Sequence, residues 1–182
     1  TAMRSGARMG DTKRIDSMVA ALTDPFGVGH MGMTAENLAV KWNISREEQD
    51  AFALESQKRA AAAVANGYFK EQIVPITMQT RKGDVVFDTD EHIRGSTTAE
   101  ALAKMKPAFK KDGTVTAGNA SGINDGAGFL VLADGAKAAA GGFKPMARLV
   151  AYGIGGVPNE IMGEGPIPAT KIALARAGMT LD

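Results

Sequence analysis

The sequence predicts an α/β protein from two stretches of different character. From residue 114 onward the pattern is strand, short helix, strand and helix, an alternation typical of α/β folds. Residues 1–113 predict helices and a single hairpin instead. Near the start of the second stretch lies a polar, Gly-rich loop at residues 118–128. It leads into the apolar run 129–133, which predicts a fully buried strand.

Composition narrows the class of protein. The 182 residues suffice for one large domain or two small ones, and 45% apolar with 23% charged residues is typical of a soluble globular protein. A net charge of +1 argues against a general nucleic-acid binder. With no cysteine, the chain holds no disulfide, no thiolate nucleophile and no Cys-ligated metal. It shows neither an apolar run of membrane-spanning length nor a secretory leader, so we expect a cytoplasmic protein without membrane or nucleic-acid partners.

Local signals place the first helices. Apolar residues at i, i+3, i+4 and i+7 predict a short amphipathic helix over residues 15–22, which the Asp-Pro pair at 24–25 ends. Residues 26–32 predict a loop. Thr34 is expected to cap a second helix that reaches Trp42.

A capping box predicts the longest helix. The hydroxyl of Ser45 and the carboxylate of Glu48 suit each other's free backbone amides, and the helix is expected to run to Asn66 with Gly67 as a left-handed cap. Its predicted inner face is Ala51, Leu54, Ala61 and Ala65. Its predicted water-facing charges are Glu47, Asp50, Glu55 and Arg59.

The remaining elements follow from turn and cap signals. Residues 73–78 predict a strand that Pro75 restricts to an edge, and residues 85–87 its hairpin partner after a turn at 81–84. Thr97 and Glu100 form a second capping-box pattern, whose short helix ends before Pro107. Later elements are strands at 114–116, 129–133 and 146–154, a helix at 137–140 closed by Gly141 and Gly142, a rigid loop at 162–168 and a helix over about 169–177 capped by Gly178.

The Gly-rich loop is the stretch that the pattern favours as a binding site. Glycine lets a ligand approach the main chain closely, while Asn, Asp and Ser tie such a turn to itself. The loop stands between two predicted strands, so a rigid sheet is expected to hold it, and an anionic ligand suits it best. The alternative is an ordinary connector, which composition alone favours over a binding loop.

Other residues that could take part in catalysis or binding either keep several possible roles or are disfavoured for them. His30 is a general base, a ligand contact or a surface hydrogen-bonding residue. Arg94 either anchors a phosphate or pairs with Asp90 or Glu91. Ser121 lacks recognisable acid and histidine partners, so a serine nucleophile is disfavoured. The two histidines are too far apart in sequence for a metal motif, and no Lys-Ser or Lys-Thr follows the glycines as a P-loop requires.

Six blocks of the sequence resemble the thiolase family. They are HMGMTAEN at 30–37, SREEQDAFA at 45–53, GYFKEQIVPI at 67–76, RKGD at 81–84, TVTAGNASGINDGA at 114–127 and MGEGPIPA at 162–169. Together these blocks extend over essentially the whole chain. Within the family they most resemble the bacterial biosynthetic branch, the acetyl-CoA acetyltransferases or β-ketothiolases.

The resemblance implies acyl transfer between coenzyme A thioesters, in which two acetyl-CoA are joined or a 3-oxoacyl-CoA is split by free coenzyme A. Coenzyme A is then a substrate, no resident cofactor or metal is expected, and the enzyme is a homodimer or tetramer of fatty acid metabolism. It also implies a five-layer αβαβα fold. On that layout residues 1–120 are an inserted loop domain covering coenzyme A, residues 121–143 end the N-terminal half, and residues 144–182 begin the C-terminal half.

The family's catalytic residues fall outside this stretch. The resemblance places the acylated cysteine before it, and an Asn-Glu-Ala-Phe motif, the catalytic histidine and a second cysteine after it. The chain starts at Thr1 without an initiator Met and ends at Asp182 directly after a predicted helix, so both ends are expected to continue. We therefore expect no catalytic residue in this chain and no activity from it alone.

Carried over position by position, the resemblance implies contacts to coenzyme A. Arg94 is expected near the nucleotide, where a guanidinium pairs with phosphate or stacks on adenine. Ser121 offers a hydroxyl to the pantetheine amides, and Met162 lines the acyl pocket. The other implied contacts, along the nucleotide and pantetheine path, are Leu22, His30, Met31, Ala108, Phe109 and Ala117. Gly95, where a His often follows the arginine, and Ala101, where a Ser can contact the nucleotide, imply a looser grip on adenosine.

Two alternatives remain open. Without the resemblance, Leu22, Phe109 and Met162 fit ordinary core positions. The chain also fits a non-catalytic module for coenzyme A binding or oligomerisation, because the thiolases that it resembles use the segment before His30 to join dimers into tetramers, and a basic start suits that role. The basic residues concerned are Arg4, Arg8, Lys13 and Arg14. A nucleic-acid arm at residues 1–14 is disfavoured because no aromatic side chain is interleaved.

Overall fold

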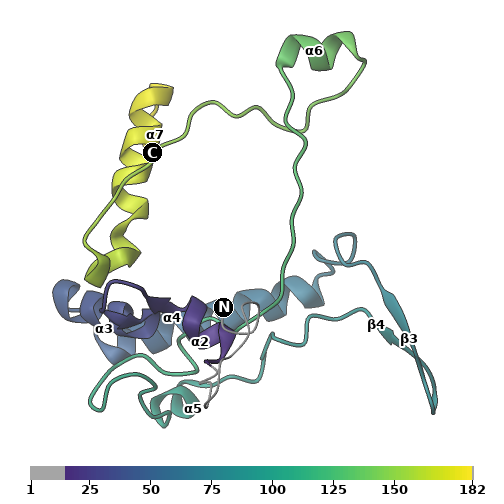
Figure 1. The fold of residues 1–182 in the computed structure, drawn as a ribbon. Coiled ribbons are helices and arrows are strands. Elements are labelled where there is room, and N and C mark those ends of the chain that lie inside the picture. The colour runs from purple at the N-terminus through teal and green to yellow at the C-terminus, as the bar shows by residue number, and fades with distance from the viewer. Residues whose placement is uncertain (1–14, 182) are drawn as a thin grey trace, which may run out of the picture.

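The computed structural model describes residues 15–181, and Figure 1 shows a group of helices, a projecting hairpin and a long excursion of chain that leads to the last helix. In chain order the elements are α2 (Ser17–Ala21), β1 (Thr23–Asp24), β2 (Gly29–His30), α3 (Met31–Trp42), α4 (Arg46–Ala65), β3 (Ile76–Thr80), β4 (Gly83–Phe87), α5 (Ala99–Ala103), α6 (Gly135–Ala140), η1 (Asn159–Glu164) and α7 (Pro166–Ala177). Within the described residues, β1 pairs with β2 and β3 with β4, both antiparallel.

The hairpin of β3 and β4 confirms the predicted pairing. Ile76 lies opposite Phe87 and Thr80 opposite Gly83, with the turn between them. Gly83 takes a φ of 115°, a conformation that favours glycine. Pairing begins at residue 76 rather than 73, because Pro75 has no N–H to offer to the ladder.

Helix α4 begins with the predicted capping box. Ser45 Oγ accepts a hydrogen bond from the Glu48 N–H at 3.1 Å, and Glu48 Oε2 accepts one from the Ser45 N–H at 2.7 Å. The helix ends at its C-cap Asn66, and Gly67 follows with a φ of 72°. Both ends of this helix are therefore confirmed.

The predicted faces of α4 need correction. Leu54 and Ala61 are half-buried, as an inner face requires, but Ala51 and Ala65 are exposed. Asp50 was expected to face water and is only 8% exposed. A buried carboxylate needs partners, and those of Asp50 come from its own helix and from a loop far along the chain.

Helix α3 begins earlier than predicted, and with a different cap. His30 is the N-cap residue, and its Nδ1 accepts a hydrogen bond from the Gly32 N–H at 3.0 Å. Thr34 lies inside the helix, 3% exposed, and its hydroxyl donates to the Met31 carbonyl at 2.7 Å. Asn43 ends the helix in the left-handed conformation. The loop predicted to reach Gly32 is thus wrong at its end, because an imidazole performs the capping expected of a hydroxyl.

Helix α5 also begins one residue later than its pattern predicts. Thr98 is the N-cap, and its Oγ1 accepts a hydrogen bond from the Ala101 N–H at 3.2 Å. The Thr97 hydroxyl donates instead to the Arg94 carbonyl at 2.8 Å. The capping box predicted from Thr97 is therefore wrong, since that hydroxyl serves the preceding turn.

The stretch predicted as a rigid loop at 162–168 is largely helical. The short 3₁₀ helix η1 ends at Glu164, and α7 starts with Pro166 in its first turn. Proline suits that position because the N–H it lacks has no partner inside a helix. Gly178 closes α7 with a φ of 65°, as predicted.

Helix η1 is held against α3 by polar contacts from residues far apart in the sequence. Asn37 Nδ2 donates to the Glu160 carbonyl at 2.9 Å. Lys41 Nζ lies 2.8 Å from Glu164 Oε1, and Trp42 Nε1 donates to the same oxygen at 2.6 Å. The C-terminal segment is therefore anchored to α3 despite the long excursion between them in Figure 1.

Three predicted strands do not form within residues 15–181. They are 114–116, 129–133 and 146–154. Phe129 is 96% and Val131 98% exposed, so the strand predicted to be fully buried is open. Strands are buried by neighbouring strands and layers, and the described residues supply none here. Figure 1 shows the first of the long segments rising to α6, the predicted helix at 137–140, and the second returning to α7.

The chain is accordingly far more exposed than a compact protein of its mass. It exposes 15498 Å². A compact monomer of 18.9 kDa exposes about 8,300 Å². The buried residues within the described part are Ala39, Leu102, Val115 and Ala138 among the apolar ones, Thr34, Glu36, Asp50 and Thr116 among the polar ones, and Gly32. All except Ala138 lie on α3, α4 or α5 or at 115–116, so the core is small and half polar.

The contact between η1 and α3 generates a prediction about pH. The hydrogen bond from Lys41, aided by one from Trp42 and by the Lys41 charge, lowers the pKa of Glu164 below its usual 4.5. A lowered pKa means that the contact contributes above that usual value and is lost as the pH falls through the lowered one. We expect Trp42 fluorescence to report release of η1 in a transition below pH 4.5.

Two variants separate this transition from general acid unfolding. Glu164→Gln removes the titrating group and is expected to abolish it. Glu160→Gln is the matched control, because Glu160 accepts the Asn37 hydrogen bond through its backbone carbonyl, which the substitution keeps. An identical acid transition in both variants would contradict the assignment.

Candidate functional site

Four of the predicted contact residues gather where α3 begins. The Leu22 carbonyl accepts a hydrogen bond from the Met31 N–H at 2.8 Å, which joins the end of α2 to the start of α3. The His30 ring stacks on the ring of Phe109, with centroids 4.7 Å apart and planes inclined by 21°. Ala108 precedes Phe109 in the chain. One end of α3 therefore brings residues 22, 30 and 31 against the stretch at 108–109.

The cap geometry defines the protonation of His30. Because Nδ1 accepts the Gly32 N–H, the neutral ring carries its proton on Nε2. The ring thus offers a donor at Nε2, and its cap hydrogen bond and its stacking on Phe109 fix its orientation. Of the three roles open from the sequence, a hydrogen-bonding contact fits this geometry best.

Gly32 allows the aromatic ring of Phe109 to lie this close. A Cβ at Gly32 would fall directly on the Phe109 ring, so any larger residue there would displace it. Phe109 is 36% exposed, Leu22 is half-buried and Met162 is 43% exposed. None of the three is plain core within the described residues, so each keeps surface for a contact.

A buried carboxylate that the sequence did not single out holds the start of the loop at 114–121. Glu36, on α3, is 3% exposed. The Thr114 N–H donates to both of its oxygens at 2.9 Å, the Thr114 hydroxyl donates at 3.2 Å, and the Val115 N–H donates at 2.9 Å. One signal in the sequence marks it: Glu36 shares a helix face with Gly32 and Ala39, at i, i+4 and i+7 spacing.

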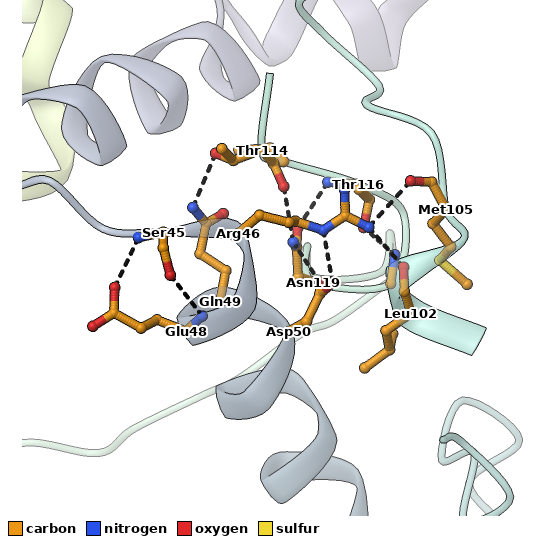
Figure 2. Close-up of polar contacts among 12 residues, drawn as sticks. Ser45, Arg46, Glu48, Gln49, Asp50, Leu102, Met105, Thr114, Thr116 and Asn119 are labelled. Atoms are coloured by element: carbon orange, nitrogen blue, oxygen red, sulfur yellow. Dashed lines mark hydrogen bonds and ion pairs between the residues drawn. The ribbon is translucent and has the colours of Figure 1, made fainter. Parts of the chain in front are cut away.

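A second network, centred on Asp50 of α4, ties the same loop further along. Figure 2 shows Arg46 and Asn119 converging on Asp50. Arg46 Nε lies 2.7 Å from Asp50 Oδ2, and its Nη2 donates to the Leu102 carbonyl at 2.6 Å and the Met105 carbonyl at 3.1 Å. Asn119 Nδ2 donates to Asp50 Oδ1 at 3.0 Å. The network therefore joins α4, α5 and the loop.

The loop also bonds to itself and to a neighbouring glutamine. Asn119 Nδ2 donates to the Thr114 carbonyl at 3.0 Å, and its Oδ1 accepts from the Thr116 N–H at 2.7 Å. Gln49 Nε2 donates to the Thr114 hydroxyl at 2.9 Å. Ala117 and Ser121 are exposed within and just after this tied stretch. They are thus presented on a fixed backbone, which favours the binding-loop interpretation over an ordinary connector.

Gly118 and Gly122 of the loop serve close packing rather than unusual backbone angles. Neither Gly118 nor Gly122 has a positive φ. A Cβ at Gly118 would meet Leu102 and Met105, and a Cβ at Gly122 would fall on the His92 ring. The second histidine of the chain therefore packs against the loop next to Ser121.

Arg94 and Met162 lie on other supports. The Arg94 N–H donates to Gln57 Oε1 on α4 at 2.8 Å, and the following Gly95 packs on Ala61 of that helix. Between residues 15 and 181 no ion pair involves Arg94, so the alternative pairing with Asp90 or Glu91 is not formed. Met162 lies on η1, next to Gly163, which contacts Leu38 of α3.

No group of three or more His, Asp or Glu residues in the described part of the chain is arranged to hold a metal ion. No helix between residues 15 and 181 is long and apolar enough to cross a membrane. The basic start, Arg4, Arg8, Lys13 and Arg14, lies outside the described residues.

The Asp50 network generates a prediction about stability. Asp50→Ala leaves the Arg46 guanidinium and the Asn119 amide without their acceptor in a largely buried place. Removing one partner of such a pair is expected to cost about 3 kcal/mol in the free energy of unfolding, measured by urea denaturation. The matched control is Glu55→Ala, which breaks the exposed pair with Arg59 one turn apart on the same helix. Equal losses in the two variants would show that the Asp50 network does not hold the fold.

Comparison with known proteins identifies the family. The family described as Thiolase, N-terminal domain, matches residues 1–136. The beta-ketothiolase BktB of Cupriavidus necator is 57% identical over 182 residues, which are 100% of this chain and 46% of that protein. The chain thus spans about half the length of this relative.

Solved structures give the same result. The Bacillus anthracis acetyl-CoA acetyltransferase has a TM-score of 0.87 and 49% identity, covering 98% of this chain and 45% of that one. Human mitochondrial 3-ketoacyl-CoA thiolase in complex with CoA has a TM-score of 0.84 and 48% identity, covering 98% and 44%. The described residues therefore adopt part of the α/β thiolase fold, including segments that are unpaired here. The chain belongs to the thiolase family.

Proposed function

We propose that this chain forms the coenzyme A-covering part of an enzyme that transfers acyl groups between coenzyme A thioesters. The reaction joins two acetyl-CoA to acetoacetyl-CoA or splits a 3-oxoacyl-CoA with free coenzyme A. The observation that carries the proposal is the convergence of Leu22, His30, Met31 and Phe109 at the start of α3. Relatives named as acetyl-CoA acetyltransferases, and a related thiolase solved with CoA, support it.

The cluster suits a ligand that is both apolar and amide-bearing. The exposed parts of Met31 and Phe109 offer apolar surface, while His30 Nε2–H offers a donor. Pantetheine alternates short alkyl stretches with amide carbonyls and N–H groups. A chain of that kind is held by apolar walls with a few placed polar groups.

The other contacts extend this path in both directions. We assign Ala108, Ala117 and Ser121 to the pantetheine channel, with the Ser121 hydroxyl bonding to an amide. The Arg94 guanidinium, free of ion pairs within the described residues, suits the phosphates or the adenine face. Met162 is assigned to the wall of the acyl pocket. Coenzyme A is a substrate in this proposal, which needs no resident cofactor.

Catalytic groups are assigned to parts of the enzyme outside residues 1–182. Acyl transfer through an intermediate in which the acyl group is bound to the enzyme as a thioester needs a thiol nucleophile, and this chain has no cysteine. The chain covers only 46% of the length of its relative BktB, so the remaining part of such an enzyme can supply these residues. We assign residues 1–120 to a loop domain, 121–143 to the end of an N-terminal half and 144–182 to the start of a C-terminal half. The unpaired segments 129–133 and 146–154 support strands completed by the rest of such an enzyme.

The proposal extends to the setting of the enzyme. We infer a cytoplasmic homodimer or tetramer that acts in fatty acid metabolism, without membrane or nucleic-acid partners. The basic residues that suit the alternative, a non-catalytic module for coenzyme A binding or oligomerisation, lie outside the described residues.

Binding of coenzyme A tests the assigned contact at Ser121. A hydrogen bond contributes about 0.5–1.5 kcal/mol, so Ser121→Ala is expected to weaken binding by about two- to tenfold while leaving the fold intact. The measurement is calorimetric titration of coenzyme A into the full-length protein that carries this chain. The control is Ser56→Ala, the same change at an exposed position of α4. If Ser121→Ala and Ser56→Ala bind as wild type does, Ser121 is only a turn-former.

Activity measured on two forms of the protein tests the function itself. The full-length protein is expected to catalyse thiolysis of acetoacetyl-CoA, and residues 1–182 alone are expected to show no turnover because they hold no thiol. Turnover by the isolated chain, in material free of host thiolase, would contradict the proposal. So would a folded full-length protein that neither binds coenzyme A nor cleaves acetoacetyl-CoA.

A further inference from the structure

The assigned coenzyme A contacts lie on two stretches that are separate in the sequence. We call residues 22–31 the first wall, because they lie at the start of α3. Residues 108–121 form the second wall, and they carry Ala108, Phe109, Ala117 and Ser121. A ligand held between two such walls requires a fixed distance between them, and sequence neighbourhood does not provide it.

Glu36 links the helix that bears the first wall directly to the backbone of the second. Its carboxylate receives the N–H groups of Thr114 and Val115 and the Thr114 hydroxyl, at 2.9 to 3.2 Å. The residue is 3% exposed, so water does not compete for these donors. Hydrogen bonds to an ionised acceptor are the stronger kind. Among the described residues it forms no ion pair, so peptide groups compensate its charge.

The link continues from Val115 back to the first wall. The Val115 carbonyl accepts the Ala108 N–H at 2.9 Å, which places the adjoining Phe109. Phe109 stacks on His30, and His30 caps the helix that carries Glu36. These contacts form a closed circuit, in which Glu36 is the one side chain that bonds α3 to residues 114–115.

We propose that Glu36 is a positioning residue that sets the spacing between the two walls of the coenzyme A channel. The inference rests on the proposed function. Glu36 touches no substrate, since its carboxylate is buried under residues 113–115. It acts by holding Ala117, Ser121 and Phe109 in place relative to His30 and Met31.

The surroundings select a carboxylate at this position. Both carboxylate oxygens accept a backbone N–H, so either orientation of a glutamine would turn its NH₂ toward the Thr114 N–H, which is a donor itself. Gly113 completes the cradle, because a Cβ there would fall on the Glu36 carboxylate. Gly113→Ala therefore displaces the carboxylate without removing its charge, and Gly113 has no positive φ that alanine would strain.

The test compares Glu36→Gln, Gly113→Ala and the control Glu71→Gln in the full-length enzyme. Glu71 is exposed and belongs to neither wall. Misplacement of binding groups is expected to raise KM for coenzyme A in thiolysis about tenfold in both cradle variants, with kcat within about twofold of wild type. Amide hydrogen exchange, measured without ligand, is expected to speed up at Thr114 and Val115 in both cradle variants. In Glu71→Gln it is expected to stay at the wild-type rate at both sites.

Each outcome decides between the claims. Faster exchange at Thr114 and Val115 with an unchanged KM would overturn the positioning role while leaving the proposed function intact. If wild type itself fails to bind coenzyme A, the proposed function falls and the positioning role falls with it. If Glu36→Gln fails to fold, Gly113→Ala decides: a normal KM and normal exchange in that variant would overturn the inference.

Discussion

Hydrogen bonds from the peptide groups of residues 114 and 115 to a buried carboxylate on α3 are the interaction on which the rest of this structure depends. Glu36 fixes the start of the loop, and Asp50, through Asn119 and Arg46, fixes its middle to α4 and α5. The apolar core of the described residues is small, so these polar networks do much of the positioning. Exposed residues such as Ser121 therefore belong to or directly follow a stretch of backbone that these buried side chains hold in place.

Local features could be predicted from the sequence, whereas long-range polar contacts could not. The capping box at Ser45 and the left-handed Gly67 depend on a few adjacent residues and are confirmed. The prediction that Asp50 faces water is wrong because its loop partner Asn119 lies 69 positions away, too far for a local pattern to indicate the contact. Glu36 went unnoticed because its partners are 78 and 79 positions away. Capping of α3 by an imidazole was missed because hydroxyl and carboxamide side chains are the usual N-caps.

The predicted strands also show that a local sequence pattern does not determine long-range contacts. Apolar runs at 129–133 and 146–154 predict strands, but none forms there, because both pairing and burial depend on neighbours that residues 15–181 do not supply. Resemblance to a family supplied the candidate contacts, and the geometry groups Leu22, His30, Met31 and Phe109 around one helix end. Arg94 and Met162 are supported by α4 and η1 instead. Their relation to the cluster rests on the proposed path of the ligand.

A crystal structure of the full-length protein with coenzyme A tests the central claim most directly, because it shows whether the ligand runs between the two walls. The account predicts pantetheine lying along Met31 and Phe109, with its amides within hydrogen-bond distance of His30 Nε2 or Ser121 Oγ, and Glu36 still bonded to residues 114 and 115. Coenzyme A bound elsewhere, with residues 22–31 and 108–121 free of contact, would contradict it.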